Sequence, residues 1–186
     1  SYLGHDPELF NDSVRNNVLL GDDYDVFEYL RVVCMDKEVE AMEQGADTII
    51  GSEGIRLSGG QAQRIALART LCHKKLVLVL DDPFSALDRN TEEQIYKKLK
   101  DMASDNIVIL ISHRLYMFPK MDKVIWMDAG MVNVGTHKEL MLECPGYRKM
   151  YETVSVEECR AVETENEGLA AAKVVENSRR VVDKHE

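Results

Sequence analysis

Two short, uninterrupted aliphatic runs restrict what this chain can fold into more than any other feature of the sequence. Leu76–Leu80 and Ile107–Ile111 contain no polar residue, and continuous apolar runs of this length are typical of parallel strands that are buried on both faces. Between them, residues 91–102 carry apolar side chains at helical spacing, and Asn90 is the expected N-cap. The order strand, helix, strand therefore predicts two parallel strands joined by a helical crossover.

Shorter elements are expected on both sides of this unit. Ser1–Leu3 reads as the end of a strand, so we expect the chain to start inside a domain. Residues 11–44 carry apolar side chains at steps of three and four between acidic ones, which predicts a small helical region. Residues 124–134 predict a β-hairpin, and Thr136 and Glu139 behind it have the spacing of a capping box for another helix.

The composition excludes several classes of protein. Lys and Arg number 23 against 33 Asp and Glu, and a net charge of -10 repels nucleic acid, so no nucleic-acid partner is expected and any phosphate must be held by a local site. The aliphatic runs are far shorter than the roughly 20 residues that cross a bilayer. The chain opens with no readable secretory signal, and its four scattered cysteines predict no disulfide framework.

The segment Leu57–Gln61 carries the most specific chemistry. Ser58 and Gln61 have the spacing of a capping box that any helix could use, but capping alone does not explain Gly59 and Gly60 between them. Two glycines at the start of a helix let a ligand approach the backbone, while free amides and the helix dipole attract an anion. We therefore expect a phosphate site here.

Acidic and histidine side chains follow the two apolar runs. Asp81 and Asp82 end the first strand, where open parallel sheets place ligands and where a carboxylate can hold magnesium. A solvated acidic turn is the alternative interpretation, since Asp-Asp-Pro is common loop chemistry. His113 follows the second strand, and a lone histidine at such a place is more often structural than catalytic. Only the combination of motifs favours function.

Taken together, the motifs resemble the nucleotide-binding domain of ATP-binding-cassette (ABC) transporters of the exporter type, over residues 1–154. Four stretches match in the family's order: the signature motif at Leu57–Gln61, the Walker B strand at Val77–Asp81, the D-loop at Ser85–Asp88 and the switch histidine at His113. His5 stands where the family has its Q-loop glutamine.

The resemblance implies a fold, partners and a location. The expected fold class is α/β, a partial P-loop NTPase-like ABC ATPase core with an α-helical subdomain and signature helix over about residues 11–73. Two such domains would pair head to tail, with ATP and Mg²⁺ between the signature motif of one and the P-loop of the other. Residues 10–44 would meet the coupling helices of a transmembrane domain, at the cytoplasmic face of the cell membrane. Residues 155–186 are expected to be a frayed or disordered charged tail.

The resemblance also implies roles for single residues. Asp81 would bind magnesium, and Asp82 stands at the position of the glutamate that polarises the attacking water. His113 would contact the γ-phosphate, and His5 would lie beside the nucleotide. Contacts to the ATP held by the partner domain are expected from Ser58, Gly59, Gly60, Gln61 and Asp88.

Three departures from the family pattern weaken the site. The chain contains no G-x-x-x-x-G-K-[ST] motif, so by itself it has no P-loop lysine and should bind ATP poorly. Asp82 is one methylene shorter than glutamate, and a misplacement of about 1 Å can cost on the order of a hundredfold in rate. His5 exchanges a neutral amide for a titratable ring. Hydrolysis at this chain's own site should therefore be slow.

Two functions follow, and the sequence leaves both open. The first is an ATP-binding and ATP-hydrolysing region of an ABC exporter that couples dimerisation to transmembrane export and is inactive as an isolated fragment. The second is a low-hydrolysis module that lends Leu57–Gln61 to a partner ATPase, and the changes at His5 and Asp82 resemble one half of a heterodimeric exporter. A soluble cassette ATPase for DNA repair or translation is disfavoured by the acidic balance. The cargo is unreadable, because membrane helices select it.

Overall fold

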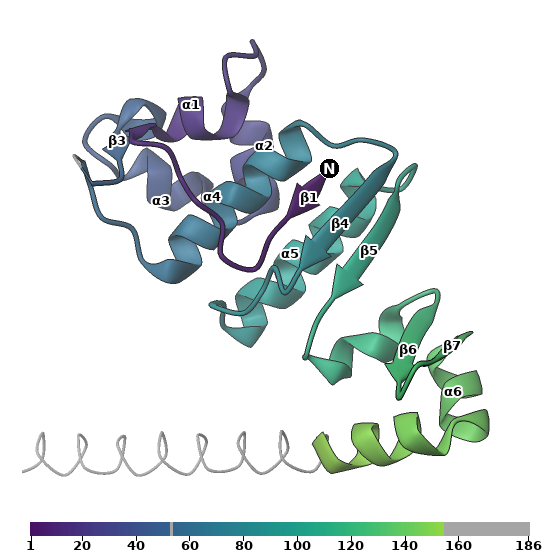
Figure 1. The fold of residues 1–186 in the computed structure, drawn as a ribbon. Helices are drawn as coiled ribbons and strands as arrows, with labels where there is room; N and C mark the ends of the chain where they lie inside the picture. The colour runs from purple at the N-terminus through teal and green to yellow at the C-terminus, as the bar shows by residue number, and fades with distance from the viewer. Residues whose placement is uncertain (53, 155–186) are drawn as a thin grey trace, which may run out of the picture. The chain divides into compact units, whose positions relative to one another are not determined.

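The structure is a computed structural model that describes residues 1–52 and 54–154. Its contacts divide the chain into two compact units, Ser1–His113 and the part that begins at Arg114 (Figure 1). The predicted charged tail, residues 155–186, lies outside the described residues. No helix within the described ranges is long and apolar enough to span a bilayer. Cys34, Cys72 and Cys144 are free thiols, while Cys159 falls in the undescribed part.

A parallel sheet forms the centre of the first unit. Its strands are β1 (Tyr2–Leu3), β4 (Val77–Asp81) and β5 (Ile107–Ile111), in the order β1-β4-β5, and α5 (Arg89–Met102) connects β4 to β5. The strand–helix–strand prediction is thus confirmed. Because the strands are parallel, β1, β4 and β5 all end at the same edge of the sheet, and the candidate residues that follow them gather there.

The predicted N-cap of α5 was wrong by two residues. Asp88 caps the helix: its backbone is extended, with φ -71° and ψ 155°, and its carboxylate accepts a hydrogen bond from the Thr91 amide. Asn90 lies inside the first turn instead, because the helix begins at Arg89. Asp88, the last residue of the D-loop motif, is therefore anchored at a helix terminus.

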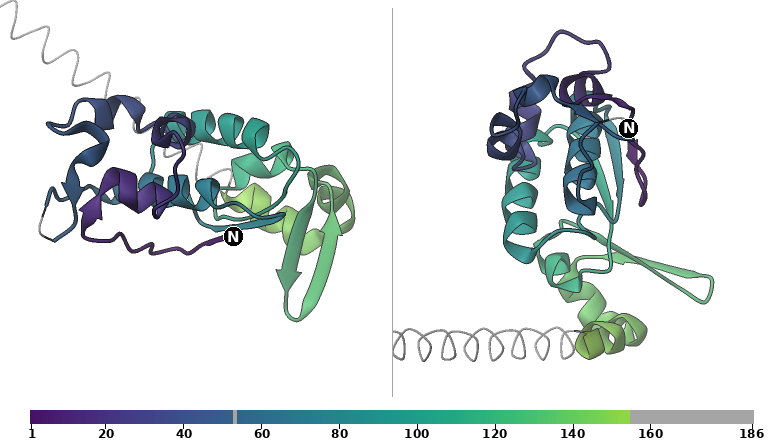
Figure 2. Two further views of the ribbon diagram at one scale, coloured as in Figure 1. Left: turned by 90° about the horizontal axis from the view of Figure 1, so that it is seen from above. Right: turned by 90° about the vertical axis from the view of Figure 1, so that its left-hand side faces the viewer.

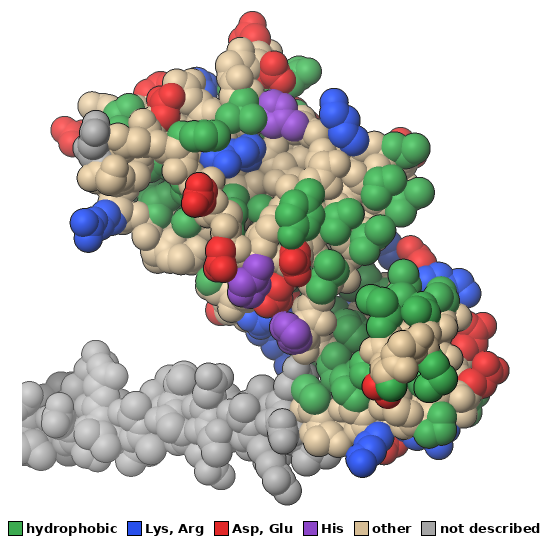
Figure 3. Space-filling view, in the orientation of Figure 1, with side chains coloured by type: hydrophobic (Ala, Val, Ile, Leu, Met, Phe, Trp, Pro, Cys, Tyr) green, Lys and Arg blue, Asp and Glu red, His purple; other side chains and the backbone are tan. Residues whose placement is uncertain are grey.

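The prediction that both long strands are buried on both faces was also wrong. Leu78 and Leu80 of β4 are fully buried, whereas Ile107 and Ile111 of β5 are about half exposed, at 57% and 48%. Figure 2 places α4 and α5 on the same side of the three strands, so the helices cover one face. Within Ser1–His113 no described helix covers the other face, where Figure 3 shows hydrophobic side chains over β4 and β5.

The helical region between β1 and β4 is confirmed. It consists of α1 (Val14–Leu19), α2 (Val26–Val32), α3 (Asp36–Glu40), the 3-10 turn η1 (Gly45–Asp47) and the long helix α4 (Gly59–Cys72). Two-residue strands β2 (Asp12–Ser13) and β3 (Ile49–Ile50) pair antiparallel beside them. Their buried side chains form one core with the apolar face of α4, including Val14, Val18, Leu30, Ile65 and Leu71.

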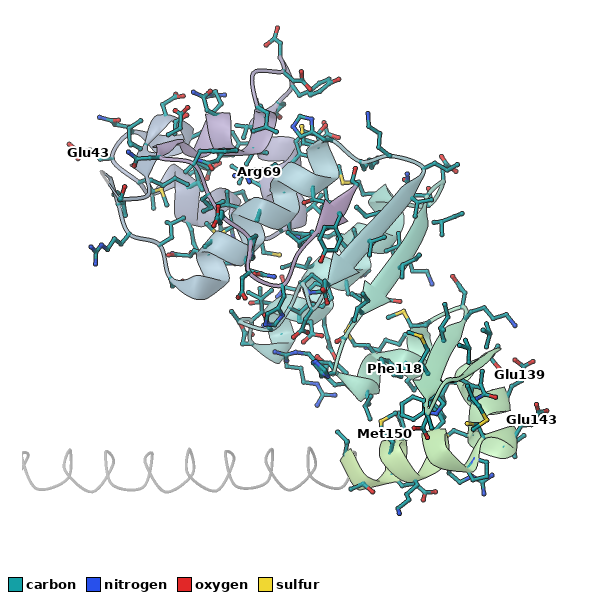
Figure 4. All side chains as sticks on the ribbon, in the orientation of Figure 1. Glu43, Arg69, Phe118, Glu139, Glu143 and Met150 are labelled. Carbon is teal, nitrogen blue, oxygen red and sulfur yellow. The ribbon has the colours of Figure 1, made fainter. Side chains whose placement is uncertain are left out.

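Arg69 ties α4 to the chain that leads into α1 (Figure 4). Its guanidinium donates to the backbone oxygens of Asn17 at 2.6 Å and Glu8 at 2.9 Å and to the Asn17 side-chain oxygen at 2.7 Å. It also lies 4.8 Å from the centre of the Phe10 ring. Burial lowers the pKa of this guanidinium, and neutral oxygens supply the hydrogen bonds that compensate for the lost hydration.

The second unit is built on a hairpin and helices. After η2 (Leu115–Lys120), β6 (Val124–Asp128) pairs antiparallel with β7 (Met131–Gly135), and α6 (His137–Glu143) follows. Thr136 and Glu139 form the predicted capping box, with side-chain to backbone distances of 3.3 and 2.7 Å. Residues 145–154 are helical as well. Val124, Leu140 and Tyr147 form the buried core of this unit.

Candidate functional site

The signature turn, Leu57–Gln61, begins α4 with the predicted capping box. The Ser58 hydroxyl accepts a hydrogen bond from the Gln61 amide at 3.2 Å, and the Gln61 side-chain oxygen accepts one from the Ser58 amide at 2.9 Å. Gly59 and Gly60 are the first two residues of the helix, where backbone amides have no acceptor within the helix. Because the Ser58 oxygen acts as an acceptor, its hydroxyl proton can still be donated to a ligand.

Gly60 makes the closest approach in the site. A methyl group at this position would come within 2.7 Å of the Ala86 carbonyl oxygen and 3.3 Å of the Leu87 side chain. The same group at Gly59 would meet only the Ala86 methyl, at 3.9 Å. The absence of a side chain at residue 60 therefore lets the D-loop segment, Ser85–Asp88, pack directly against the signature turn.

Signature turn and D-loop segment together line one pocket. Its volume is about 490 Å³, and its walls are Glu38, Ser58, Gly59, Gly60, Arg64, Ala86, Leu87, Asp88 and Thr91. Hydrogen bonds from the Thr91 side chain and amide lower the pKa of Asp88, so this carboxylate stays charged at neutral pH. Gln61 does not line the pocket; its side chain bonds the Ser58 amide in the capping box.

The donors in this pocket fit a phosphate group. The amides of Gly59 and Gly60 and the Ser58 hydroxyl are donors, and the positive end of α4 opens there. The Arg64 guanidinium also lines the pocket, but it donates to Glu38 and to two backbone carbonyls. The carboxylates of Asp88 and Glu38 line the same pocket. Asp88 is engaged by Thr91, and Glu38 is engaged by Arg64 at 2.8 Å, so both carboxylates are already compensated by donors of this chain.

A second group of candidate residues lies at the carboxyl edge of the sheet. Asp81 ends β4 and accepts a hydrogen bond from the Tyr2 hydroxyl at 3.2 Å. Asp82 is 8% exposed and adopts a left-handed backbone with φ 45°, and its amide donates to the Ile111 carbonyl at 2.8 Å. The His5 ring lies 3.8 Å from the Asp82 carboxylate. His5 and Asp82, the two positions that depart from the family pattern, are thus neighbours.

The carboxyl edge offers magnesium one carboxylate rather than a cage. In the part of the chain that is described, no three His, Cys, Asp or Glu side chains are grouped to hold a metal. Magnesium commonly takes one or two carboxylates, several waters and substrate phosphates, so Asp81 alone is compatible with it. The edge residues Asp81, Asp82, His5 and His113 do not line the signature pocket, and His113 is exposed after β5.

Two charged residues of the pocket were missed by the sequence interpretation. Glu38, on α3, contacts both Gln61 and Arg64, and nothing in its local sequence distinguishes it from the other acidic residues of that helix. Arg64 follows Gly60 by one helical turn and donates to the Gly60 carbonyl at 3.2 Å. That spacing was a readable signal, because residues four apart lie on the same face of a helix.

Comparison with known proteins decides the family. A family model described as ABC transporter matches residues 1–85. The ATP-dependent lipid A-core flippase of Alcanivorax borkumensis is 38% identical over 149 residues, which is 77% of this chain and 26% of the flippase. The chain belongs to the ABC transporter family. Further relatives of this ABC chain include P-glycoprotein 14 of Caenorhabditis elegans, 39% identical over 141 residues, 73% of this chain and 11% of that protein.

A solved structure agrees with the ABC assignment. The structure of a bacterial Atm1-family ABC exporter with ATP bound superimposes with a TM-score of 0.76 and 31% identity, over 83% of this chain and 28% of that one. The predicted α/β fold of an ABC ATPase core with a helical subdomain is thereby confirmed. The ABC chain spans about a quarter of the length of the flippase and of the exporter.

Proposed function

We propose that this chain is the ATP-binding region of an ABC exporter and that its signature turn completes the ATP site of a facing domain. The observation that carries the proposal is the joint pocket of Ser58, Gly59, Gly60 and Asp88, in which unpaired helix amides face a space of about 490 Å³. A γ-phosphate held by a second nucleotide-binding domain fits that donor set.

The proposed contacts need a partner domain. The chain contains no P-loop motif, so the groups that would cradle the β- and γ-phosphates must come from elsewhere in the assembly. A head-to-tail pair of nucleotide-binding domains supplies such a P-loop opposite the signature turn. Relatives named as an exporter and a flippase support a membrane transport role, and for that role we propose that the domain lies at the cytoplasmic face. Side chains from within residues 10–44 then supply the surface for the coupling helices.

The chain's own catalytic edge is proposed to turn over slowly. When bound, magnesium would neutralise phosphate charge, and Asp81 would hold it, with the Tyr2 hydroxyl orienting the carboxylate. Asp82 stands where water would be polarised, but its carboxylate is shorter than that of glutamate and lies 3.8 Å from His5. His113 would reach the γ-phosphate from the end of β5. Degenerate residues beside an intact signature turn favour a heterodimeric exporter.

A substitution at Ser58 tests the proposal in the assembled transporter. Ser58→Glu places a negative charge at the mouth of the pocket and should reduce ATP turnover at least a hundredfold, the size seen when a phosphate or oxyanion contact is lost. Glu40→Gln, on the exposed side of α3, is the control for a charge change outside the pocket. Turnover of Ser58→Glu equal to that of the control would show that the signature turn does not contact ATP.

The second candidate function is a module that lends its signature turn and hydrolyses little itself. The close His5 and Asp82 pair favours it. Asp82→Asn separates the two: it leaves turnover of the assembled complex nearly unchanged if the chain only lends its surface, and it abolishes turnover if the assembly depends on hydrolysis at the chain's own edge.

A further inference from the structure

We propose that Glu38 is a positioning residue for the signature turn. Its single carboxylate, on α3, holds Gln61 and Arg64 and thereby fixes the direction in which the Gly59 and Gly60 amides point. This inference rests on the proposed function, in which those amides meet a γ-phosphate, and it adds a residue outside the motif to that site.

Each carboxylate oxygen of Glu38 has its own donor. One oxygen accepts from the Gln61 side-chain amide at 2.8 Å, and the other accepts from an Arg64 terminal nitrogen at 2.8 Å. Burial opposes the charge of this carboxylate, but the hydrogen bonds from Arg64 and Gln61 outweigh it and lower the pKa of Glu38. The carboxylate therefore remains charged and links Gln61, the last residue of the turn, to Arg64 in the next turn of α4.

Gln61 and Arg64 in turn hold the backbone on both sides of the glycine pair. The Gln61 side-chain oxygen accepts from the Ser58 amide at 2.9 Å, before the pair. The Arg64 Nε donates to the Gly60 carbonyl at 3.2 Å, after it. Glycine has no side chain to restrict its backbone, so these two bonds add to the Ala62 amide to Ser58 carbonyl bond and the Gln61 amide to Ser58 hydroxyl bond in limiting rotation of the turn. Glu38 is the common support of the two side-chain bonds.

Arg64 also needs Glu38 to stay in place. Its side chain is 11% exposed and lines the signature pocket, and besides Glu38 it donates to the carbonyl oxygens of Gly60 and Cys34. A cation beside a triphosphate that is not held by a carboxylate is free to pair with the phosphate and to release Gly60. Glu38 thus keeps Arg64 bonded to the turn when an anion enters.

The helix that carries Glu38 offers a matched control. α3 has five residues, Asp36–Glu40, and Val39 is its buried anchor in the core. Glu38 is partly exposed, at 40% of its side chain, and Glu40 is exposed on the same helix, away from the signature pocket. Neutralising each of them in turn therefore changes the same net charge on the same helix, but only one change reaches the signature turn.

The test compares Glu38→Gln, Glu38→Asp and Glu40→Gln in the assembled transporter, with ATP turnover measured as a function of ATP concentration. A glutamine at residue 38 presents an NH₂ group to one of its two donors, so the half-saturating ATP concentration should rise about tenfold, the size expected for one lost charge-assisted hydrogen bond. Glu38→Asp keeps the charge but is too short to reach both donors, so its half-saturating ATP concentration should lie between those of the wild type and Glu38→Gln. A purely structural defect lowers the maximal rate instead, because it removes folded enzyme.

Two reference results separate failure of this inference from failure of the proposed function. If Ser58→Glu retains turnover, the proposed function is wrong. If Ser58→Glu abolishes turnover while Glu38→Gln behaves like Glu40→Gln, the positioning role is overturned. Should Glu38→Gln not assemble, hydrogen exchange of the assembled Glu38→Asp transporter decides: amides 58–62 exchange faster than in the wild type if Glu38 supports the turn, and equal exchange refutes it.

Discussion

Replacing Gly60 by alanine tests the close packing of the signature turn against the D-loop segment. The new methyl group would lie 2.7 Å from the Ala86 carbonyl oxygen, a distance that carbon and oxygen do not tolerate, and 3.3 Å from the Leu87 side chain. Because a carbonyl oxygen is part of the backbone, relief requires the whole segment to move. Such overpacking costs about 1–3 kcal/mol, against a gain of up to about 1 kcal/mol from the better helix propensity of alanine.

Gly59→Ala is the matched control for stability. Its methyl group would meet the Ala86 side chain at 3.9 Å, which is ordinary contact, so the propensity gain remains unopposed. The two variants should therefore differ by about 2 kcal/mol in the free energy of unfolding, which at a urea m-value of about 2 kcal/mol per molar separates their midpoints by about 1 M. Urea unfolding followed by circular dichroism measures this difference. A Gly60→Ala midpoint at or above that of Gly59→Ala would refute the close approach.

Three further predictions concern the fold, the pH response and the catalytic edge. Arg69 donates to Glu8 and Asn17 from three different nitrogens, and the single nitrogen of a lysine cannot reach all three acceptors. Arg69→Lys should therefore lower the free energy of unfolding by about 2–4 kcal/mol in the same urea assay. The control Arg15→Lys weakens only an exposed pair with Asp47 and should cost below about 1 kcal/mol. Since the pKa of Glu38 is lowered in the folded state, its stabilising contribution is present above the ordinary pKa of 4.5 and is lost as the pH falls through the folded pKa. Below pH 4.5 the urea midpoint of Glu38→Gln should therefore fall less steeply with falling pH than that of the wild type. Parallel plots of midpoint against pH would contradict the ion pair. Asp82→Glu should raise turnover at the chain's own edge by up to about a hundredfold, and an unchanged single-turnover rate would show that carboxylate length is not what limits it.

Local spacing predicted those parts of the fold that depend on neighbours in sequence. Both capping boxes and the hairpin follow from residues within a few positions of each other, and the strand–helix–strand unit follows from the apolar pattern within each element; the structure confirms them. The N-cap of α5 was misplaced because Asp88 and Asn90 are both good capping residues. What distinguishes them is the extended backbone of Asp88, which the preceding turn sets and which composition does not reveal.

Features that depend on distant contacts could not be read from the sequence. An aliphatic run such as Ile107–Ile111 looks the same whether helices cover one face of the strand or both, and in the described residues they cover one. Glu38 meets Gln61 and Arg64 across 23 and 26 residues of chain, a separation at which no periodicity links them. The sequence motif was enough to locate the signature turn, but the contacts of Glu38 with it are visible only in the structure.

The most direct test of a signature turn that serves a neighbouring domain is photo-crosslinking from ATP itself. An ATP analogue with a photoreactive group on its γ-phosphate is bound to the assembled transporter, irradiated, and the labelled peptides are identified by mass spectrometry. We predict label on residues 57–61 of this chain, lost when the P-loop lysine of the facing domain is removed. Label confined to the facing domain, or label on residues 57–61 that persists without that lysine, would contradict a shared site.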